Sequence, residues 1–106
     1  MFNENGIEIE IKNNSSQTIT DVEFTTSERL EIIKIDRIEP NESVTEFLSM
    51  EQNKSDGFYW LSFTRPNGEK DISGGGYYTN GDALNKWVKF EIITDTTYST
   101  FSSSKN

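Results

Sequence analysis

Apolar and polar residues alternate along most of the chain, the pattern of β-strands that bury one face. In GIEIEIKN, isoleucines at every second position alternate with charged residues. TITDVEFTT, GFYWLSFTR and WVKFEIITD repeat this period. In TITDVEFTT we expect Thr20, Val22 and Phe24 to point inward. The apolar phases of these strands predict one buried core, made of Ile7, Ile9, Ile11, Val22, Phe24, Leu61, Phe63, Val88, Phe90 and Ile92.

Polar segments and turn-forming residues separate these strands. NNSSQ (13–17) predicts a turn that joins the first two strands as a hairpin, and Pro40 presets the backbone of a later turn. In LEIIKI the apolar phase slips between Ile32 and Ile33, which indicates a bulge or an edge strand. We expect the long polar stretch 51–57 to connect two sheets, and TTYSTF to add a short final strand.

No window of eleven or more residues keeps a helical apolar stripe. Seven or eight short strands with turns between them predict an all-β protein, an antiparallel β-sandwich. The length suits one domain with one modest core. We expect this single domain to span residues 1–101 and residues 102–106 to form a mobile tail.

Two quoted segments carry a family resemblance. IKNNSSQTITDVEF, followed by IDRIEPNESVTEF, resembles the first half of small immunoglobulin-like domains from bacteria and their phages. The resemblance covers Ile7 to about Met50, while the Cys–Trp–Cys core of antibody domains is absent because the chain has no cysteine. It implies an immunoglobulin-like architecture and a role as a binding or spacer module.

The net charge of −8 is confined to the first half of the sequence. Residues 1–53 hold twelve acidic and four basic groups (−8), whereas residues 54–106 hold six of each (zero). This balance argues against nucleic acid or an anionic membrane as a partner. The N-terminus shows no secretory signal and no apolar run approaches the length of a membrane span, so we expect a cytoplasmic location.

The segment DISGGGYYTNGD (71–82) is the most unusual in the chain. It lacks the glycine spacing of phosphate-binding loops. Asp71, Ser73 and Asp82 echo a calcium loop, but Gly75 supplies no side-chain ligand, so no metal is predicted. Three glycines in a strand favour a bulge or a bend. We expect this bend to place Tyr77 or Tyr78 beside Trp60 or Trp87; the alternative is a ligand groove that the tyrosines cover.

The aromatic residues cannot all face the core, because alternate residues of a strand point to opposite sides. If Tyr59, Leu61 and Phe63 are inward, then Phe58 and Trp60 are outward. Trp87 is out of phase with its strand and should also face outward. Such a set is either an exposed binding surface or a second layer covered by a loop.

Catalysis has little support in the residue inventory. The chain has no histidine or cysteine, which excludes the usual triads, thiol chemistry and ordinary zinc sites. Glu8 and Glu10 would lie about 6.5–7 Å apart on one strand face, near the spacing of inverting glycosidases. They alternate with core residues and should be solvated, which does not produce the buried acid that such an enzyme needs. We therefore expect no enzymatic activity and no cofactor.

The sequence favours a module that binds a protein partner. Two surfaces compete for this role: an acidic face around Glu8, Glu10, Asp21 and Glu23, suited to a basic partner, and an aromatic–glycine surface of Trp60, Tyr77, Tyr78 and Trp87. A carbohydrate-binding module that uses the aromatics, and an acidic inhibitor or immunity protein, are the alternatives. The sequence leaves the oligomeric state open.

Overall fold

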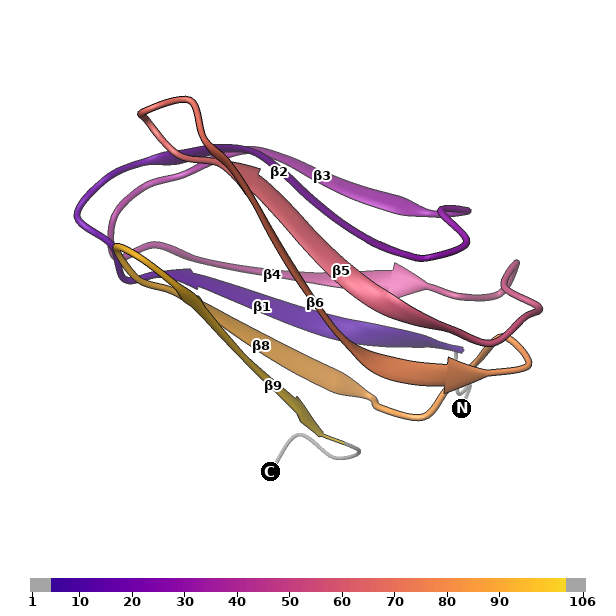
Figure 1. Ribbon diagram of the computed structural model, residues 1–106. Helices are drawn as coiled ribbons and strands as arrows, with labels where there is room; N and C mark the ends of the chain where they lie inside the picture. The colour runs from indigo at the N-terminus through magenta and orange to yellow at the C-terminus, as the bar shows by residue number, and fades with distance from the viewer. Residues whose placement is uncertain (1–4, 103–106) are drawn as a thin grey trace.

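The computed structural model describes residues 5–102, which form nine β-strands in two sheets and contain no helix (Figure 1). The strands are two to ten residues long because turn-forming residues interrupt the alternating pattern. The strands are β1 (Gly6–Asn13), β2 (Ile19–Thr26), β3 (Ile32–Ile38), β4 (Ser43–Ser49), β5 (Gly57–Thr64), β6 (Lys70–Thr79), β7 (Asp82–Ala83), β8 (Trp87–Ile92) and β9 (Thr97–Ser102).

The two sheets pack on each other in a sandwich-like arrangement (Figure 1). Sheet A has the order β4-β1-β8-β9 and sheet B the order β3-β2-β5-β6-β7. All pairings are antiparallel except β1 with β8, which is parallel. Sheet A is therefore mixed, which corrects the expectation of a wholly antiparallel fold.

The predicted hairpin between the first two strands is wrong. β1 lies in the middle of sheet A and β2 lies in sheet B, so the segment between them crosses from one layer to the other. Asn13 holds this crossing together, since its buried side-chain amide donates to the carbonyls of Gln17 and Ile38 at 2.9 Å. Its carbonyl oxygen accepts from the hydroxyl of Ser15 at 2.6 Å. The polar turn residues thus satisfy backbone groups between the layers.

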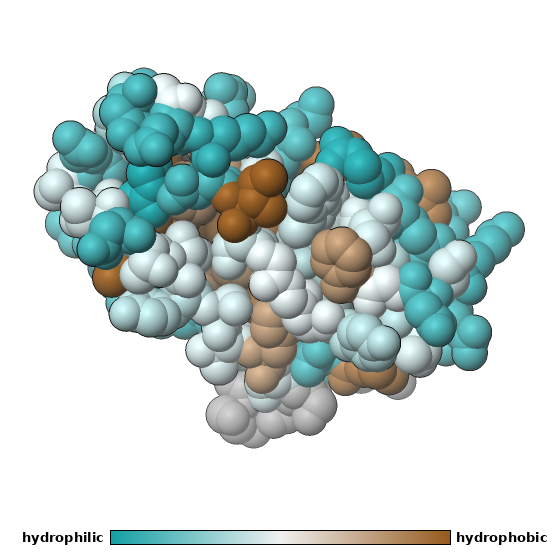
Figure 2. All heavy atoms as spheres, viewed as in Figure 1, coloured by the Kyte–Doolittle hydropathy of each residue, from teal (hydrophilic) through white to brown (hydrophobic). Residues whose placement is uncertain are grey.

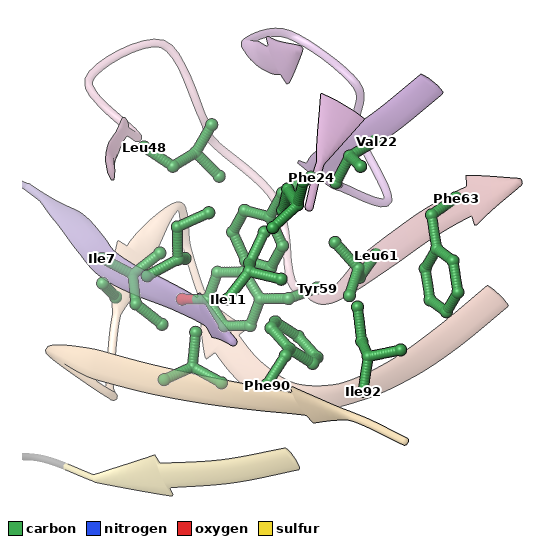
Figure 3. Packing of buried hydrophobic residues seen from close by; sticks show 14 of the residues in the cluster. Ile7, Ile11, Val22, Phe24, Leu48, Tyr59, Leu61, Phe63, Phe90 and Ile92 are labelled. Atoms are coloured by element: carbon green, nitrogen blue, oxygen red, sulfur yellow. The ribbon is translucent and has the colours of Figure 1, made fainter. Parts of the chain in front are cut away.

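All ten residues predicted for the core are buried. Tyr59 lies at the centre of the cluster, with its ring stacked on Phe24 at 6.0 Å (Figure 3). Burial raises the pKa of the Tyr59 hydroxyl above its usual range, and that hydroxyl contacts the sulfur of Met50 at 3.4 Å. The core gains further buried hydrophobic residues beyond the ten: Ile19, Ile38, Leu48, Met50, Tyr59, Tyr78 and Ala83.

A bulge at Asp21 corrects the expected phase of β2. The register of β2 with β5 shifts between Thr20 and Glu23, and Asp21 has a φ of 50°. An extra residue at this point reverses which side chains face inward. Ile19 is therefore buried and Thr20 is exposed, whereas Val22 and Phe24 keep their predicted positions.

The other segment predictions have clear outcomes. The phase slip at Ile32–Ile33 belongs to an edge strand, because β3 ends sheet B. The 51–57 segment does connect the two sheets, and TTYSTF does form a final strand. Ser102 belongs to β9, and the rest of the predicted tail, 103–106, lies outside the described residues.

Candidate functional site

β6 has a bulge at the end of its glycine run, as predicted. Gly74 and Gly75 pair regularly with Trp60 and Tyr59, and the register with β5 shifts between Gly75 and Tyr78. Gly76 has a φ of 73°, and a Cβ atom there would lie 2.5 Å from the ring of Phe101 and 2.8 Å from the ring of Tyr59. Gly76 is therefore needed for its backbone conformation and for the close packing of two rings.

The bulge turns Tyr78 into the core and leaves Tyr77 outside. Tyr78 is fully buried, and its ring centroid lies 5.5 Å from that of Tyr59. Tyr77 is 64% exposed and makes no ring contact with either tryptophan within residues 5–102. The expectation that one of these tyrosines would pack beside Trp60 or Trp87 is therefore wrong, because the inserted residue sends Tyr78 to the face opposite Trp60.

Glu28 fixes the end of the fold at which Tyr78 is buried. Its carboxylate accepts from the Asn53 amide at 2.9 Å and from the Tyr78 hydroxyl at 2.8 Å. It also accepts from two backbone amides, those of Lys54 and Ser55. The bond from Asn53, opposed by partial desolvation and reinforced by the other donors, lowers the pKa of Glu28 below its ordinary value of 4.5.

This lowered pKa predicts a pH-dependent contribution to stability. A carboxyl group whose pKa is lower in the folded state stabilises fully above the unfolded pKa, and the gain is lost as pH falls through the folded value. We expect the wild type to unfold at higher urea concentration than Glu28→Gln near pH 7, with the gap shrinking as the pH falls below the ordinary pKa of 4.5. Urea melts of both proteins at several pH values measure this gap. A gap that stays constant with pH would contradict the assigned role of the carboxylate.

The outer face of sheet B carries an apolar surface beside the glycine bulge. We call it the aromatic–glycine patch and define it as Phe58, Trp60, Ile72, Gly74 and Tyr77. It shares only Trp60 and Tyr77 with the aromatic–glycine surface predicted from the sequence. The strand pairing sets Trp60 beside Gly74 and Ser62 beside Ile72, on the side opposite the buried Leu61 and Phe63. Ile72 is 59% exposed and Phe58 46%. Figure 2 shows brown and white residues gathered across the middle of this view, with hydrophilic residues towards its two ends.

Gly74 has a different environment from Gly76. Among residues 5–102, a Cβ atom at Gly74 would meet only the carbonyl oxygen of Tyr59, at an ordinary distance of 3.6 Å. The space over Gly74 is therefore open, and neither packing nor a positive φ requires glycine there. The absence of a side chain leaves the patch flat beside Trp60 and allows a partner to approach the backbone closely.

Trp60 is the partly covered centre of the patch. The guanidinium of Arg29 lies 5.5 Å from the centroid of its ring, a cation–π contact. The indole N–H of Trp60 is buried and finds no hydrogen-bond acceptor among the described residues. Buried donors without a partner are uncommon in folded proteins. The outward orientation predicted for Phe58 and Trp60 agrees with the pairing, so the outer face of β5 is aromatic.

The structure does not bring the predicted aromatic set together. Trp87 lies on sheet A, where Glu8 separates it from the exposed ring of Phe47. Its indole N–H is also buried without an acceptor in the described part of the chain. Trp60 and Tyr77 belong to sheet B, and Tyr78 belongs to the core. Of the four aromatic residues proposed for one surface, only Trp60 and Tyr77 share a face.

The four acidic residues predicted as one face are also divided. Glu8 and Glu10 point outward from sheet A, because they alternate with the buried isoleucines of β1. Asp21 and Glu23 lie on sheet B, where they line a hollow of about 350 Å³ together with Lys34, Asp36 and Lys70. The predicted hairpin would have placed all four on one face, and the crossing between layers separates them.

The charge asymmetry of the sequence becomes an asymmetry in space. β4 and β1 are adjacent in sheet A, β3 and β2 are adjacent in sheet B, and β3 contacts β4 between the layers. The strands of the acidic half of the sequence therefore form one lateral side of the fold, and β5–β9 form the other (Figure 1). We call the first the acidic side. Sequence reasoning missed this surface because it depends on the order of strands in both sheets.

Asp71, at the start of the calcium-like spacing, lies in β6 and forms a salt bridge with Arg65. The Nε of Arg65 donates to its carboxylate at 2.6 Å, while Nη1 of Arg65 donates to the carbonyls of Ile93 and Thr94. Asp82, at the other end of this spacing, is exposed in β7. Within residues 5–102 no three acidic, histidine or cysteine side chains gather in a metal-binding cluster.

Comparisons with known proteins inform the fold alone. No family model and no curated protein matches the chain. A solved structure, described as the NMR structure of the protein from Eubacterium rectale, matches with a TM-score of 0.58 at 10% identity. The match covers 95% of this chain and 92% of that one. At this identity the likeness establishes a shared all-β, two-sheet arrangement. Residues 5–102 contain no helix long and apolar enough to cross a membrane.

Proposed function

We propose that this protein is a non-enzymatic binding module that recognises a protein partner through the aromatic–glycine patch. The observation that carries the proposal is the open space over Gly74, next to the partly exposed Trp60 and the exposed Ile72. A contiguous exposed apolar surface on a small domain is typical of an interaction site. Its residue types also match interface centres, where aromatic residues and arginine are enriched.

The unpaired indole N–H of Trp60 supports the same proposal. A partner that displaced the half-exposed side chain of Arg29 would reach the ring and supply an acceptor. Satisfying a buried donor in this way would add about 1–3 kcal/mol to binding. Trp60 would then be the central contact, with Phe58 and Tyr77 around it.

A capture experiment with matched variants tests the patch. Ile72→Asp introduces a charge into it, whereas Leu84→Asp makes the same change at a residue of similar exposure (50% against 59%) outside it. Immobilised wild type should capture its partner from a lysate of the producing cells at both low and high salt. Ile72→Asp should weaken capture at least tenfold, while Leu84→Asp should leave it intact. Equal capture by both variants would overturn the patch as the binding site.

The same experiment includes the carbohydrate alternative. Exposed aromatic rings also stack on sugars, so the immobilised protein is passed over a glycan array as well. Selective glycan retention that Ile72→Asp abolishes, without capture of any protein, would replace the protein partner with a carbohydrate.

An acidic inhibitor or immunity protein is a second candidate, favoured by the acidic side. The excess of acidic residues among the described residues of the acidic side would steer a basic partner towards β3 and β4. In this case high salt should abolish capture, and Asp36→Lys on β3 should weaken it more than Asp95→Lys on the opposite side. Both aspartates are exposed, which makes the two substitutions a matched pair.

We also propose a distant relationship to immunoglobulin-like domains. It rests on the resemblance of the segment from Ile7 to about Met50, together with two sheets packed around one core. The parallel pairing of β1 with β8 in this chain is the feature to compare first with immunoglobulin-like domains.

A further inference from the structure

The strands at the edges of the two sheets differ in how they are protected. A free edge presents unpaired backbone groups, and monomeric proteins usually block it with charges, proline, bulges or very short strands. Sheet A ends at β4 and β9. Sheet B ends at β3 and β7, and β7 covers only the last two residues of β6.

Three of these edges carry such protection. β3 presents Lys34, Asp36 and Arg37. In β4, Glu46 pairs with the buried Ile9 and therefore projects from the core-facing side, an inward-pointing charge. The free part of β6 begins with two charged residues and then bulges at the glycines, and β7 itself has two residues.

β9 has none of these features. Its sequence, TYSTFS, contains no charged residue and no proline. Its register with β8 is continuous from Thr97 to Ser102, so no bulge interrupts it. No strand within residues 5–102 pairs with its outer edge. A neutral edge without a bulge, here Thr97–Phe101, is the arrangement that favours pairing with another strand.

We propose that this edge pairs with the β9 edge of a second copy of the chain, joining two sheets A into one continuous sheet. Opposite residues in an antiparallel pair share a face. Tyr98 and Thr100 of one copy therefore oppose outer-face residues of the other, and Ser99 and Phe101 oppose inner-face residues. No like charges oppose each other in any register, and hydroxyl groups face one another, a favourable cross-strand pair.

The distribution of charge favours a second copy of the chain as the partner and β9 as the edge that pairs. Two chains of net charge −8 repel each other, so they approach best through the side with no net charge. β9 and its neighbour β8 belong to residues 54–106, whose charges cancel. Pairing through β4, the other end of the same sheet, would bring two acidic sides together and place Glu46 next to its own equivalent.

A strand of six residues offers a small contact, so the dimer is expected to be weak and dependent on concentration. In sedimentation equilibrium, the average mass should rise from 12.2 kDa towards twice that value as the protein approaches about 1 mM. Thr100→Lys, an exposed change in the middle of β9, should weaken association at least tenfold. The lysine reduces the net negative charge, so general repulsion cannot explain a loss.

Thr45→Lys is the matched control, because Thr45 is an exposed threonine on β4 at the other edge of the same sheet. It makes the same change in charge and should leave association intact. Hydrogen exchange of the wild type gives a second measurement: amides of 97–101 should gain protection with concentration while those of β3 should not. A mass of 12.2 kDa at every concentration, or a dimer that Thr45→Lys abolishes and Thr100→Lys does not, would overturn the proposal.

Discussion

Replacing Phe90 with alanine is expected to lower the free energy of unfolding by about 3–5 kcal/mol. Phe90 is 1% exposed and lies between the two sheets, with its ring edge-on to Phe24 at 5.7 Å and to Phe101 at 6.3 Å. Removing it leaves a cavity bounded by rings from β2 and β9 that cannot collapse without moving a strand. A domain of this size has about 5–15 kcal/mol of stability in total, so much of it would be lost.

Phe58→Ala provides the control for this prediction. It deletes the same side chain from the outer face of β5, where Phe58 is 46% exposed. Urea unfolding followed by tryptophan fluorescence should show a loss of about 1 kcal/mol or less for this variant. Phe90→Ala with a midpoint close to that of the wild type, or equal losses for the two variants, would mean that the inward and outward phases of the strands are assigned wrongly.

Most of the core could be predicted from the sequence because strand phase is a local property. In β1 and β8 every second residue is apolar, and burial of one phase is the arrangement that removes those side chains from water. Exceptions arise where one inserted residue reverses the phase. Asp21 exposes Thr20 and buries Ile19, and nothing in TITDVEF distinguishes an aspartate in a bulge from one on a regular outer face.

Strand pairing was harder to predict because it depends on distant segments. A polar turn such as 13–17 can close a hairpin within one sheet or cross to another layer. The choice follows from the partners of β1, which are β4 and β8. Those partners lie more than thirty and seventy residues further along the chain. The same error carried through to the candidate site, since it placed Glu8 and Asp21 on one face.

The candidate site was predicted in part. Alternation along β5 correctly gave an outward Trp60, and triple glycine correctly gave a bulge. The sequence does not show that Gly75 and Gly76 have a positive φ while Gly74 is regular. It therefore could not predict which of Tyr77 and Tyr78 points into the core. The different roles of the glycines follow from their surroundings in the fold: Gly76 contacts packed rings, whereas Gly74 faces open space.

This difference between the glycines leads to the second large prediction. Gly76→Ala should lower the free energy of unfolding by about 2–4 kcal/mol, combining the strain of a positive φ with the overpacking of two rings. The fully buried ring of Tyr59 cannot move away, because Phe24 and Tyr78 pack against it. Gly74→Ala is the neighbouring control and should change stability by no more than about 0.5 kcal/mol, since the φ of Gly74 is not positive and its surroundings are open.

A double variant separates the two causes of the Gly76 effect. Phe101→Ala removes the ring closest to a Cβ atom at position 76. If overpacking contributes, the combined loss for Gly76→Ala with Phe101→Ala should be smaller than the sum of the single losses, by about 1 kcal/mol or more. Strict additivity would leave backbone strain as the whole cause. A Gly76→Ala protein as stable as Gly74→Ala would refute both the strain and the overpacking assigned to Gly76.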